Sequence, residues 1–283
     1  MDAAFNLCYV QHLVGERVSN THLAKKITFD NAMLLYLDNN TNNRNNPNEN
    51  YAREFLELFT ILKGPQIGEG DYTNYTEHDI QQTARVFSGI KTKPLRDTID
   101  IDTGIPMGYV NVNQHDSDSK IFSAAFNYQT IQGGSTESGV VQEVDDFVEM
   151  IFSNSETAKS YCRKLYRFFV RREWGDDVEN DIINPLSEQL IDLDYNLESV
   201  LKTLLTSQHF YDEDNSDTTN EIIGGMIKSP IQFLTEIISF LNIDIPNPEA
   251  SSDNPPATWT TDQEDFYHFY WKFCHNTFFP GSG

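Results

Sequence analysis

The chain has 283 residues, with 20 Lys and Arg against 43 Asp and Glu, for a formal charge of −23. That balance argues against general nucleic-acid binding and against docking on an anionic membrane, because both need clustered cations. The clearest apolar run, residues 32–37, is far too short to span a bilayer. Three cysteines allow at most one disulfide, so the composition indicates an acidic, soluble, globular protein.

The two ends of the chain are both abrupt. The residues after Met1 lack the cationic start and the long apolar segment of a signal peptide. At the other end an aromatic segment, residues 266–279, runs directly into Pro-Gly-Ser-Gly. We therefore expect the chain to be an interior piece of a longer protein.

Helical periodicity covers most of the chain. The predicted helices are residues 3–13, 21–27, 31–37, 49–63, a helix capped by Thr76 and Asp79 that ends near residue 88, 140–152, 156–171, 178–190, 197–206 and 230–241. Between residues 91 and 138 the periodicity fails, and we expect irregular chain with one small β-hairpin formed by 109–112 and 120–126. The predicted fold class is mainly α, a multi-helix globular domain with an irregular segment.

The domain assignment follows from composition. Residues 1–245 are predicted to form a single α-helical domain. Residues 246–283 are predicted to be a linker, rich in Pro, Asn and Ser, followed by an aromatic C-terminal segment. The acidic stretch 212–221 is also predicted to be a solvated linker, because charge runs of this kind usually stay disordered. Its first acidic residues have the spacing of a calcium-binding loop, but Asp217 and Ile223 stand where such a loop needs Gly and Glu.

The clearest helix, residues 49–63, carries one group of candidate site residues. On a helical projection its apolar residues form one stripe, and Glu54 lies at the border of that stripe. One interpretation is an ordinary surface helix with ion pairs between residues four apart. The other is one wall of a polar pocket formed by Asn50, Arg53, Glu54 and Glu57, in which a partly desolvated carboxylate suits acid–base chemistry.

A second group lies in the irregular segment, where functional residues often concentrate. His115, Asp116 and Lys120 fall within six residues of each other. The histidine could ligate a metal, transfer a proton or only make local hydrogen bonds, and the sequence leaves these alternatives open. Several standard catalytic and nucleotide-binding motifs are absent. The sequence identifies no cofactor-binding residues and predicts no metal site.

The aromatic C-terminal segment is a candidate contact surface. Phe266, Phe269, Tyr270 and Phe273 have the spacing of one packing face of a helix. Because nothing follows the segment that could cover it, we expect this face to bind a protein partner.

Several segments, in order, resemble a known family. They are NAMLLYLD at 31–38, NENYAREFLELF at 48–59, Tyr-Thr at 75–76 with its helix, His-Asp with Lys at 115–120, SYCRKLYRFFV at 160–170, LLTSQHF at 204–210 and IKSPI at 227–231. The pattern resembles DUF1800, an uncharacterised bacterial protein family, over residues 28–245. The resemblance implies a mainly α architecture and an exported, periplasmic or extracellular protein, but it carries no agreed activity. Phe59 departs from the His that the family often has there.

Two functional hypotheses remain at this stage. The first is an exported hydrolase in which Asn50, Arg53, Glu54 and Glu57 meet His115 and Asp116, with Arg53 or Lys120 stabilising negative charge. The second is a non-catalytic envelope, assembly or binding module, in which the same polar residues lock the irregular segment to a helix. We favour the second, because an interior piece that lacks its flanking helices is expected to have an incomplete pocket.

Overall fold

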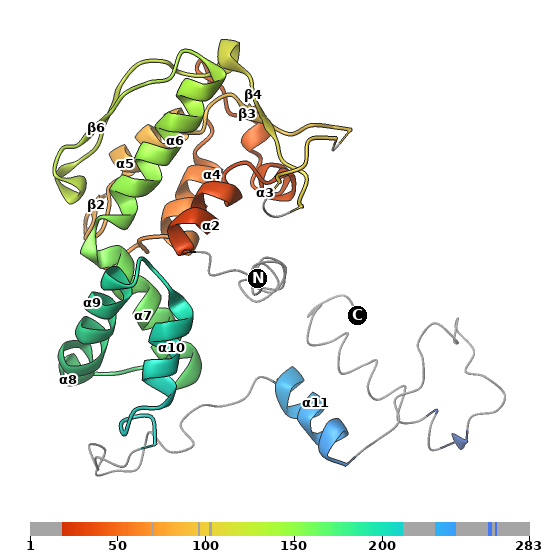
Figure 1. The fold of residues 1–283 in the computed structure, drawn as a ribbon, viewed down its shortest axis with the longest axis vertical. Coiled ribbons are helices and arrows are strands. Elements are labelled where there is room, and N and C mark those ends of the chain that lie inside the picture. Colours follow the sequence, from red (N-terminus) through yellow and green to blue (C-terminus); the bar gives the residue numbers. More distant parts are fainter. Residues whose placement is uncertain are drawn as a thin grey trace. The chain divides into compact units, whose positions relative to one another are not determined.

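The computed structural model describes residues 19–69, 71–95, 97–101, 104–211 and 230–241, together with 260, 261 and 264. The chain divides into two compact units, residues 1–223 and 224–283. The described parts are mainly helical with a few short strand pairs, so the predicted fold class is confirmed (Figure 1). The predicted helix at 3–13, the two predicted linkers and the four aromatic residues of the C-terminal segment lie outside the described residues.

The N-terminal helices begin where local capping residues predict. They are α2 (Asn20–Ile27), α3 (Asn31–Tyr36), α4 (Glu49–Glu54) and α5 (Glu77–Val86). A side-chain oxygen accepts an N–H of the first turn in each case, from Ser19, Asp30, Asn48 and Thr76. Thr76 and Asp79 form the predicted capping box, since each side chain binds the other's backbone N–H.

The helix predicted at 49–63 is shorter than expected. Its α-helical part ends at Glu54, and a π-helical turn, Phe55–Phe59, follows before the chain leaves helical geometry at Thr60. Two carbonyl groups after this point are held by distant side chains, because Asn74 Nδ2 donates to Ile61 O at 3.2 Å and to Leu62 O at 3.1 Å. At the end of the helical turn itself, Tyr161 Oη donates to Phe59 O at 2.6 Å, a long-range contact that the helical periodicity alone does not reveal.

The later helices match their predicted positions within a few residues. They are α6 (Glu137–Phe152), α7 (Ser155–Phe169), α8 (Asp176–Val178), α9 (Asn184–Asp192), α10 (Leu197–Leu205) and α11 (Pro230–Phe240). The helix predicted at 178–190 is α8 and α9 joined by a π-helical turn, Glu179–Ile183. The last of these helices, α11, belongs to the second unit. Among the described residues, no helix is long and apolar enough to cross a membrane.

The predicted β-hairpin is wrong in its pairing. The strands are β1 (Gln66–Gly68), β2 (Asp71–Tyr72), β3 (Ile90–Lys91), β4 (Tyr109–Val110), β5 (Lys120–Ile121) and β6 (Thr130–Ile131). The segment at 109 pairs with β3 and the segment at 120 pairs with β6, both antiparallel. Two left-handed residues, Asn127 and Tyr128, reverse the chain between β5 and β6, and this turn selects the nearer partner.

An aromatic cluster joins the irregular segment to the helices. Phe147 of α6 lies 5.9 Å from the ring of Phe55, 5.5 Å from Phe87 and 5.6 Å from Phe122, measured between centroids. All four rings are buried. Figure 1 shows α6 crossing this part of the fold, where it packs against α2, α5 and α7. The inner face of α6 is therefore the centre of the first unit's core.

We expect Phe147→Ala to lower the free energy of unfolding by about 3–5 kcal/mol, because it removes a ring that three others contact. Phe168→Ala is the matched control, since that ring on α7 is 60 % exposed, and it should cost well under half as much. Urea titration followed by circular dichroism measures both. Equal losses would contradict the assignment of α6 to the centre of the core.

Candidate functional site

A carboxylate lies buried on the inner face of α6 and holds two basic residues of the irregular segment. Glu143 Oε2 is 2.9 Å from Nε2 of His115, and Glu143 Oε1 is 2.5 Å from Nζ of Lys120. All three side chains are fully shielded from solvent. We call Glu143, His115 and Lys120 the Glu143 network. It connects β5 and the chain before it to α6.

Two glycines let the backbone approach this network. Gly89 has a φ of +74°, and a Cβ there would lie 2.7 Å from His115 N and 2.7 Å from Asn111 O. Gly134 donates its backbone N–H to Glu143 Oε2 at 2.7 Å. A Cβ on Gly134 would lie 2.3 Å from the backbone of Gly139 at the start of α6. Both positions therefore need a residue without a side chain, which fixes where His115 and Glu143 meet.

Ser88, His115 and Glu143 superficially resemble a nucleophile, a base and an orienting acid. However, His115 Nδ1 lies closer to the carbonyl oxygen of Ser88, at 2.7 Å, than to its hydroxyl oxygen, at 3.4 Å. The hydroxyl instead donates to Arg85 O at 2.6 Å. Because Nδ1 must carry a proton to bind a carbonyl, it cannot accept one from Ser88. All three residues are also buried, so the arrangement is unsuited to attack on a substrate.

The oxygen atoms around the His115 ring indicate which of its nitrogens donate hydrogen bonds. Both ring nitrogens of His115 face oxygen atoms, Ser88 O and Glu143 Oε2. An ionised carboxylate accepts hydrogen bonds only, so this geometry suits a His115 that donates from both nitrogens. Burial lowers the pKa of Lys120, against the opposing effect of the Glu143 carboxylate, which raises it. Glu143 therefore serves as the common counter-ion of two buried basic groups.

Asp116 lies beside the network and has its own partner. Its carboxylate accepts from Arg85 Nε at 2.7 Å and from Nη2 at 3.3 Å. Burial raises the pKa of Asp116, but the hydrogen bonds from Arg85 and from the Asp118 amide, and the charges of Arg85 and Lys120, outweigh it. The net effect is a lowered pKa. Asp116 and Arg85 thus form a partly buried ion pair that ties the irregular segment to α5.

The predicted residues of the first group have partners elsewhere. Arg53 binds both carboxylate oxygens of Glu77, at 2.8 Å and 2.7 Å, and lies 3.4 Å from Glu49. Asn50 Nδ2 donates to the carbonyl oxygen of Leu37 at 3.1 Å. The structure therefore gives the α4 side chains Asn50 and Arg53 partners at the residue that follows α3 and on α5. His115 and Lys120 of the irregular segment instead meet Glu143 of α6.

The two predicted carboxylates of this helix remain partly accessible. Glu54, at the end of α4, is half-buried. Glu57, in the π-helical turn, is also half-buried, and it lies 3.7 Å from Nζ of Lys63. Ion pairs of this exposed kind contribute only about 0–1 kcal/mol each.

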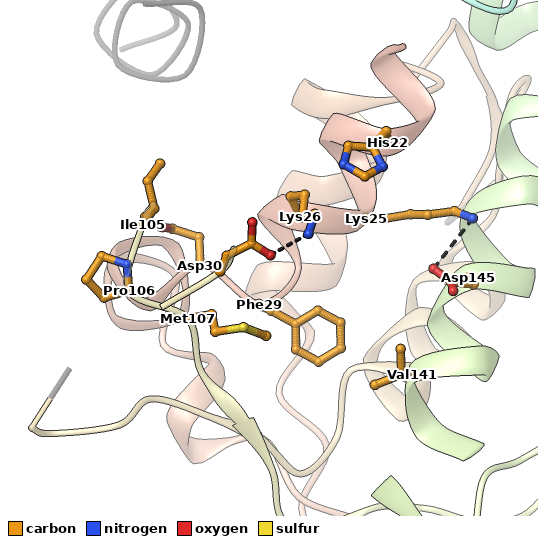
Figure 2. Close-up of a pocket in the computed structure, with 11 residues that line it drawn as sticks. His22, Lys25, Lys26, Phe29, Asp30, Ile105, Pro106, Met107, Val141 and Asp145 are labelled. Carbon is orange, nitrogen blue, oxygen red and sulfur yellow. Dashed lines mark hydrogen bonds and ion pairs between the residues drawn. The ribbon is translucent and has the colours of Figure 1, made fainter. Parts of the chain in front are cut away.

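A cavity of about 350 Å³ lies between α2, α6, Asp100 and residues 105–107; we call it the α2 cavity. Its apolar lining is Phe29, Ile105, Pro106, Met107 and Val141. Its polar lining is His22, Lys25, Lys26, Asp30, Asp100 and Asp145. Figure 2 shows Phe29, Met107 and Val141 on one side and the two lysines projecting from α2. Its size is at the lower end of the range for small-molecule sites, and its lining is more polar than is usual for them.

The lysines of the α2 cavity are already ion-paired. Lys26 binds Asp100 of the 98–107 segment. Lys25 crosses to α6, where Nζ is 2.9 Å from Glu149 and 3.5 Å from Asp145 (Figure 2). Burial lowers the pKa of Lys25, but its hydrogen bonds and the charges of Asp145 and Glu149 outweigh burial and raise the pKa. These pairs hold the walls of the cavity in place.

Backbone pairing also fixes the outer wall of the α2 cavity. Asp30 and Met107 form an isolated antiparallel bridge, and Ile99 pairs with Pro106 in the same way. Gly108 N donates to Phe29 O at 2.6 Å. Residues 98–101 and 104–107 are therefore paired with each other and joined to the chain at the end of α2.

Sequence reasoning missed Glu143 and the whole α2 cavity. Glu143 has a recognisable signal, because it lies three residues after Val140 and four before Phe147, both buried. A carboxylate at that spacing falls on the apolar face of its helix and needs a buried partner. The cavity has no such local signal, since its walls come from segments far apart in the sequence. Among the described residues, no group of three His, Cys, Asp or Glu is arranged to hold a metal ion.

Comparison with known protein families finds one family that matches the chain. The family described as "Protein of unknown function (DUF1800)" matches residues 10–268. This range contains the Glu143 network and the α2 cavity. No curated protein and no solved structure matches the chain.

We expect Glu143→Gln to lower the free energy of unfolding by about 3–5 kcal/mol, because it leaves two buried basic groups without their counter-ion. Glu137→Gln makes the same change on the exposed first turn of α6 and should cost at most about 1 kcal/mol. Urea unfolding at pH 7 compares them. Similar small losses for both variants would show that the network does not hold the fold.

The ion pair of Asp116 predicts sensitivity to acid. Because the folded-state pKa of Asp116 is lowered, its stabilisation is present above its ordinary value of 3.8 and is lost as the pH falls below it. Arg85→Gln should lower stability by about 1–3 kcal/mol at pH 7 and reduce the further loss between pH 5 and pH 3. Urea titrations at both pH values, with exposed Arg172→Gln as control, measure this. An unchanged acid dependence in Arg85→Gln would contradict the role of the pair.

Proposed function

Because the chain belongs to the DUF1800 family, for which no activity is known, we propose its function from its geometry: it is a non-catalytic binding module. Its binding site is the α2 cavity. The Glu143 network is the internal lock that holds the irregular segment on the helices. The cavity then keeps its shape without taking part in chemistry.

The single observation that carries this proposal is the sealing of the reactive groups. His115, Lys120 and Glu143 are the residues best suited to proton transfer, and their side chains are fully shielded from solvent. A general base must come within hydrogen-bond distance of its substrate, directly or through one water. Residues bound to each other in the interior do not meet this requirement. Their arrangement favours the structural role over the hydrolase alternative.

The α2 cavity supports the binding role. It is open to solvent, it has an apolar wall and its charged groups are paired. Paired charges and apolar side chains suit the binding and orientation of a ligand. The chain therefore recognises a ligand at this place and leaves it chemically unchanged.

The cellular location of this module and its partner are also part of the proposal. The family resemblance favours a periplasmic or extracellular protein, and docking through Phe266, Phe269, Tyr270 and Phe273 would fit a role in envelope assembly. These four residues lie outside the described ranges. The binding proposal rests on the α2 cavity alone.

A ligand screen by saturation-transfer NMR tests the proposal. We expect compounds that bind the wild-type protein to lose binding at least tenfold in Val141→Trp, because the indole fills the mouth of the α2 cavity. Ile191→Trp is the matched control, since Ile191 is similarly exposed on α9, at 44 % against 39 % for Val141, and does not line the cavity. That variant should bind the same compounds as the wild type.

Two results would overturn the proposal. One is a set of compounds that bind Val141→Trp as tightly as the wild type. The other is conversion of a bound compound to product that disappears in His115→Gln, since this would assign the chemistry to the buried network. Unfolding curves of each variant separate loss of binding from loss of fold.

A further inference from the structure

The charges of the α2 cavity point to the kind of ligand that it takes. Resting on the proposed function, we propose that the cavity selects a primary ammonium group carried on an apolar stem, and that Asp145 is the carboxylate that binds this group. The same chemistry occurs in a free organic amine and in a lysine side chain of a peptide.

The electrostatic field favours a cation at this site. The whole chain has a formal charge of −23. Within the cavity lining, three aspartates outnumber two lysines. A field of this sign raises the local concentration of cations and lowers that of anions. An anionic ligand would also have to displace lysines that are already bound to carboxylates.

The three aspartates differ in how firmly they are engaged. Asp30 caps α3 by accepting the N–H of Met33 at 2.8 Å, and Asp100 binds Lys26. Asp145 has the longest of these contacts, 3.5 Å to Lys25, and a third of its side chain is exposed. Lys25 has a shorter bond to Glu149, at 2.9 Å. A ligand ammonium group can therefore bind Asp145 while Lys25 stays paired with Glu149.

The apolar wall of the cavity indicates the second part of the ligand, its apolar stem. Val141 lies four residues before Asp145 on α6, so both side chains project from the same face of that helix. Figure 2 shows Phe29 and Met107 beside Val141. A stem that packs on these three side chains would place its terminal ammonium group one helical turn further along, at Asp145. An apolar stem of phenyl size fits a cavity of about 350 Å³.

Titration of the full-length protein with three matched probes at pH 7 tests this inference. The probes are 2-phenylethylamine, 2-phenylethanol and phenylacetate, which differ in charge at the end of one stem. By isothermal calorimetry or saturation-transfer NMR, we expect the amine to bind at least tenfold more tightly than the alcohol, and phenylacetate to bind least.

Two variants of adjacent residues locate the contact. Asp145→Asn should weaken binding of the amine at least tenfold and leave binding of the alcohol unchanged, because only the ion pair is removed. Asp146→Asn removes the same charge from the same helix, and Asp146 does not line the α2 cavity. The affinity of the Asp146→Asn variant for the amine should stay within twofold of that of the wild type. A thermal melt of each variant verifies that the fold is kept.

Two outcomes would overturn the inference. They are equal affinity of the amine for Asp145→Asn and wild type, and binding of phenylacetate as tight as that of the amine. If phenylacetate or the alcohol binds best and Val141→Trp blocks it, the ligand class is wrong while the proposed function stands. If every ligand of the wild type also binds Val141→Trp equally well, the proposed function itself fails.

A further pair of probes distinguishes the two sources of the ammonium group. They are the blocked dipeptide acetyl-phenylalanyl-lysine amide and its glutamine analogue. Tight binding of the lysine dipeptide, lost in Asp145→Asn and absent for glutamine, supports a basic peptide as the ligand. Binding of 2-phenylethylamine with rejection of both dipeptides supports a small free amine.

Discussion

Burial of the Glu143 carboxylate on the inner face of α6 is the constraint on which the rest of the first unit depends. A buried charge is tolerated only when it is paired and hydrogen-bonded, because it loses the solvation that water provides. Glu143 meets this condition through His115, Lys120 and the N–H of Gly134. Each of these partners lies in the irregular segment, so satisfying one carboxylate also sets the path of residues 115–134, which have little regular structure of their own.

Other contacts act in the same direction and make the segment rigid. Asp79, fully buried on α5, accepts from the backbone N–H and the hydroxyl of Ser123, both at 2.7 Å. Asp116 pairs with Arg85 of the same helix, and Phe122 packs on Phe147. Polar and apolar contacts therefore alternate along the segment. Because each group is satisfied only in this arrangement, alternative packings of the segment are disfavoured.

The contacts that make the irregular segment rigid also keep His115 from reacting with a substrate. A histidine between a carboxylate and a serine is a familiar catalytic arrangement, but its function depends on which atoms carry protons and on access to a substrate. In this case His115 Nδ1 faces a carbonyl oxygen, and the whole group is sealed. At the α2 cavity, which is open to solvent, Lys25 and Lys26 already have carboxylate partners. This division is the basis for our proposal that the chain binds a ligand without transforming it.

The sequence alone determined those features that depend on near neighbours. Helix positions, the caps at Asn48 and Thr76 and the family pattern all follow from residues a few positions apart. The sequence also singled out His115, Asp116 and Lys120, although not the helix that holds them. Only the tertiary structure decided the partners: Glu143 lies 28 residues from His115, and Asp100 lies 74 residues from Lys26. It likewise decided the pairing of β3 with β4 and the early end of α4. Local periodicity records which face of an element is buried, whereas the identity of the group on the other side depends on how the whole chain packs.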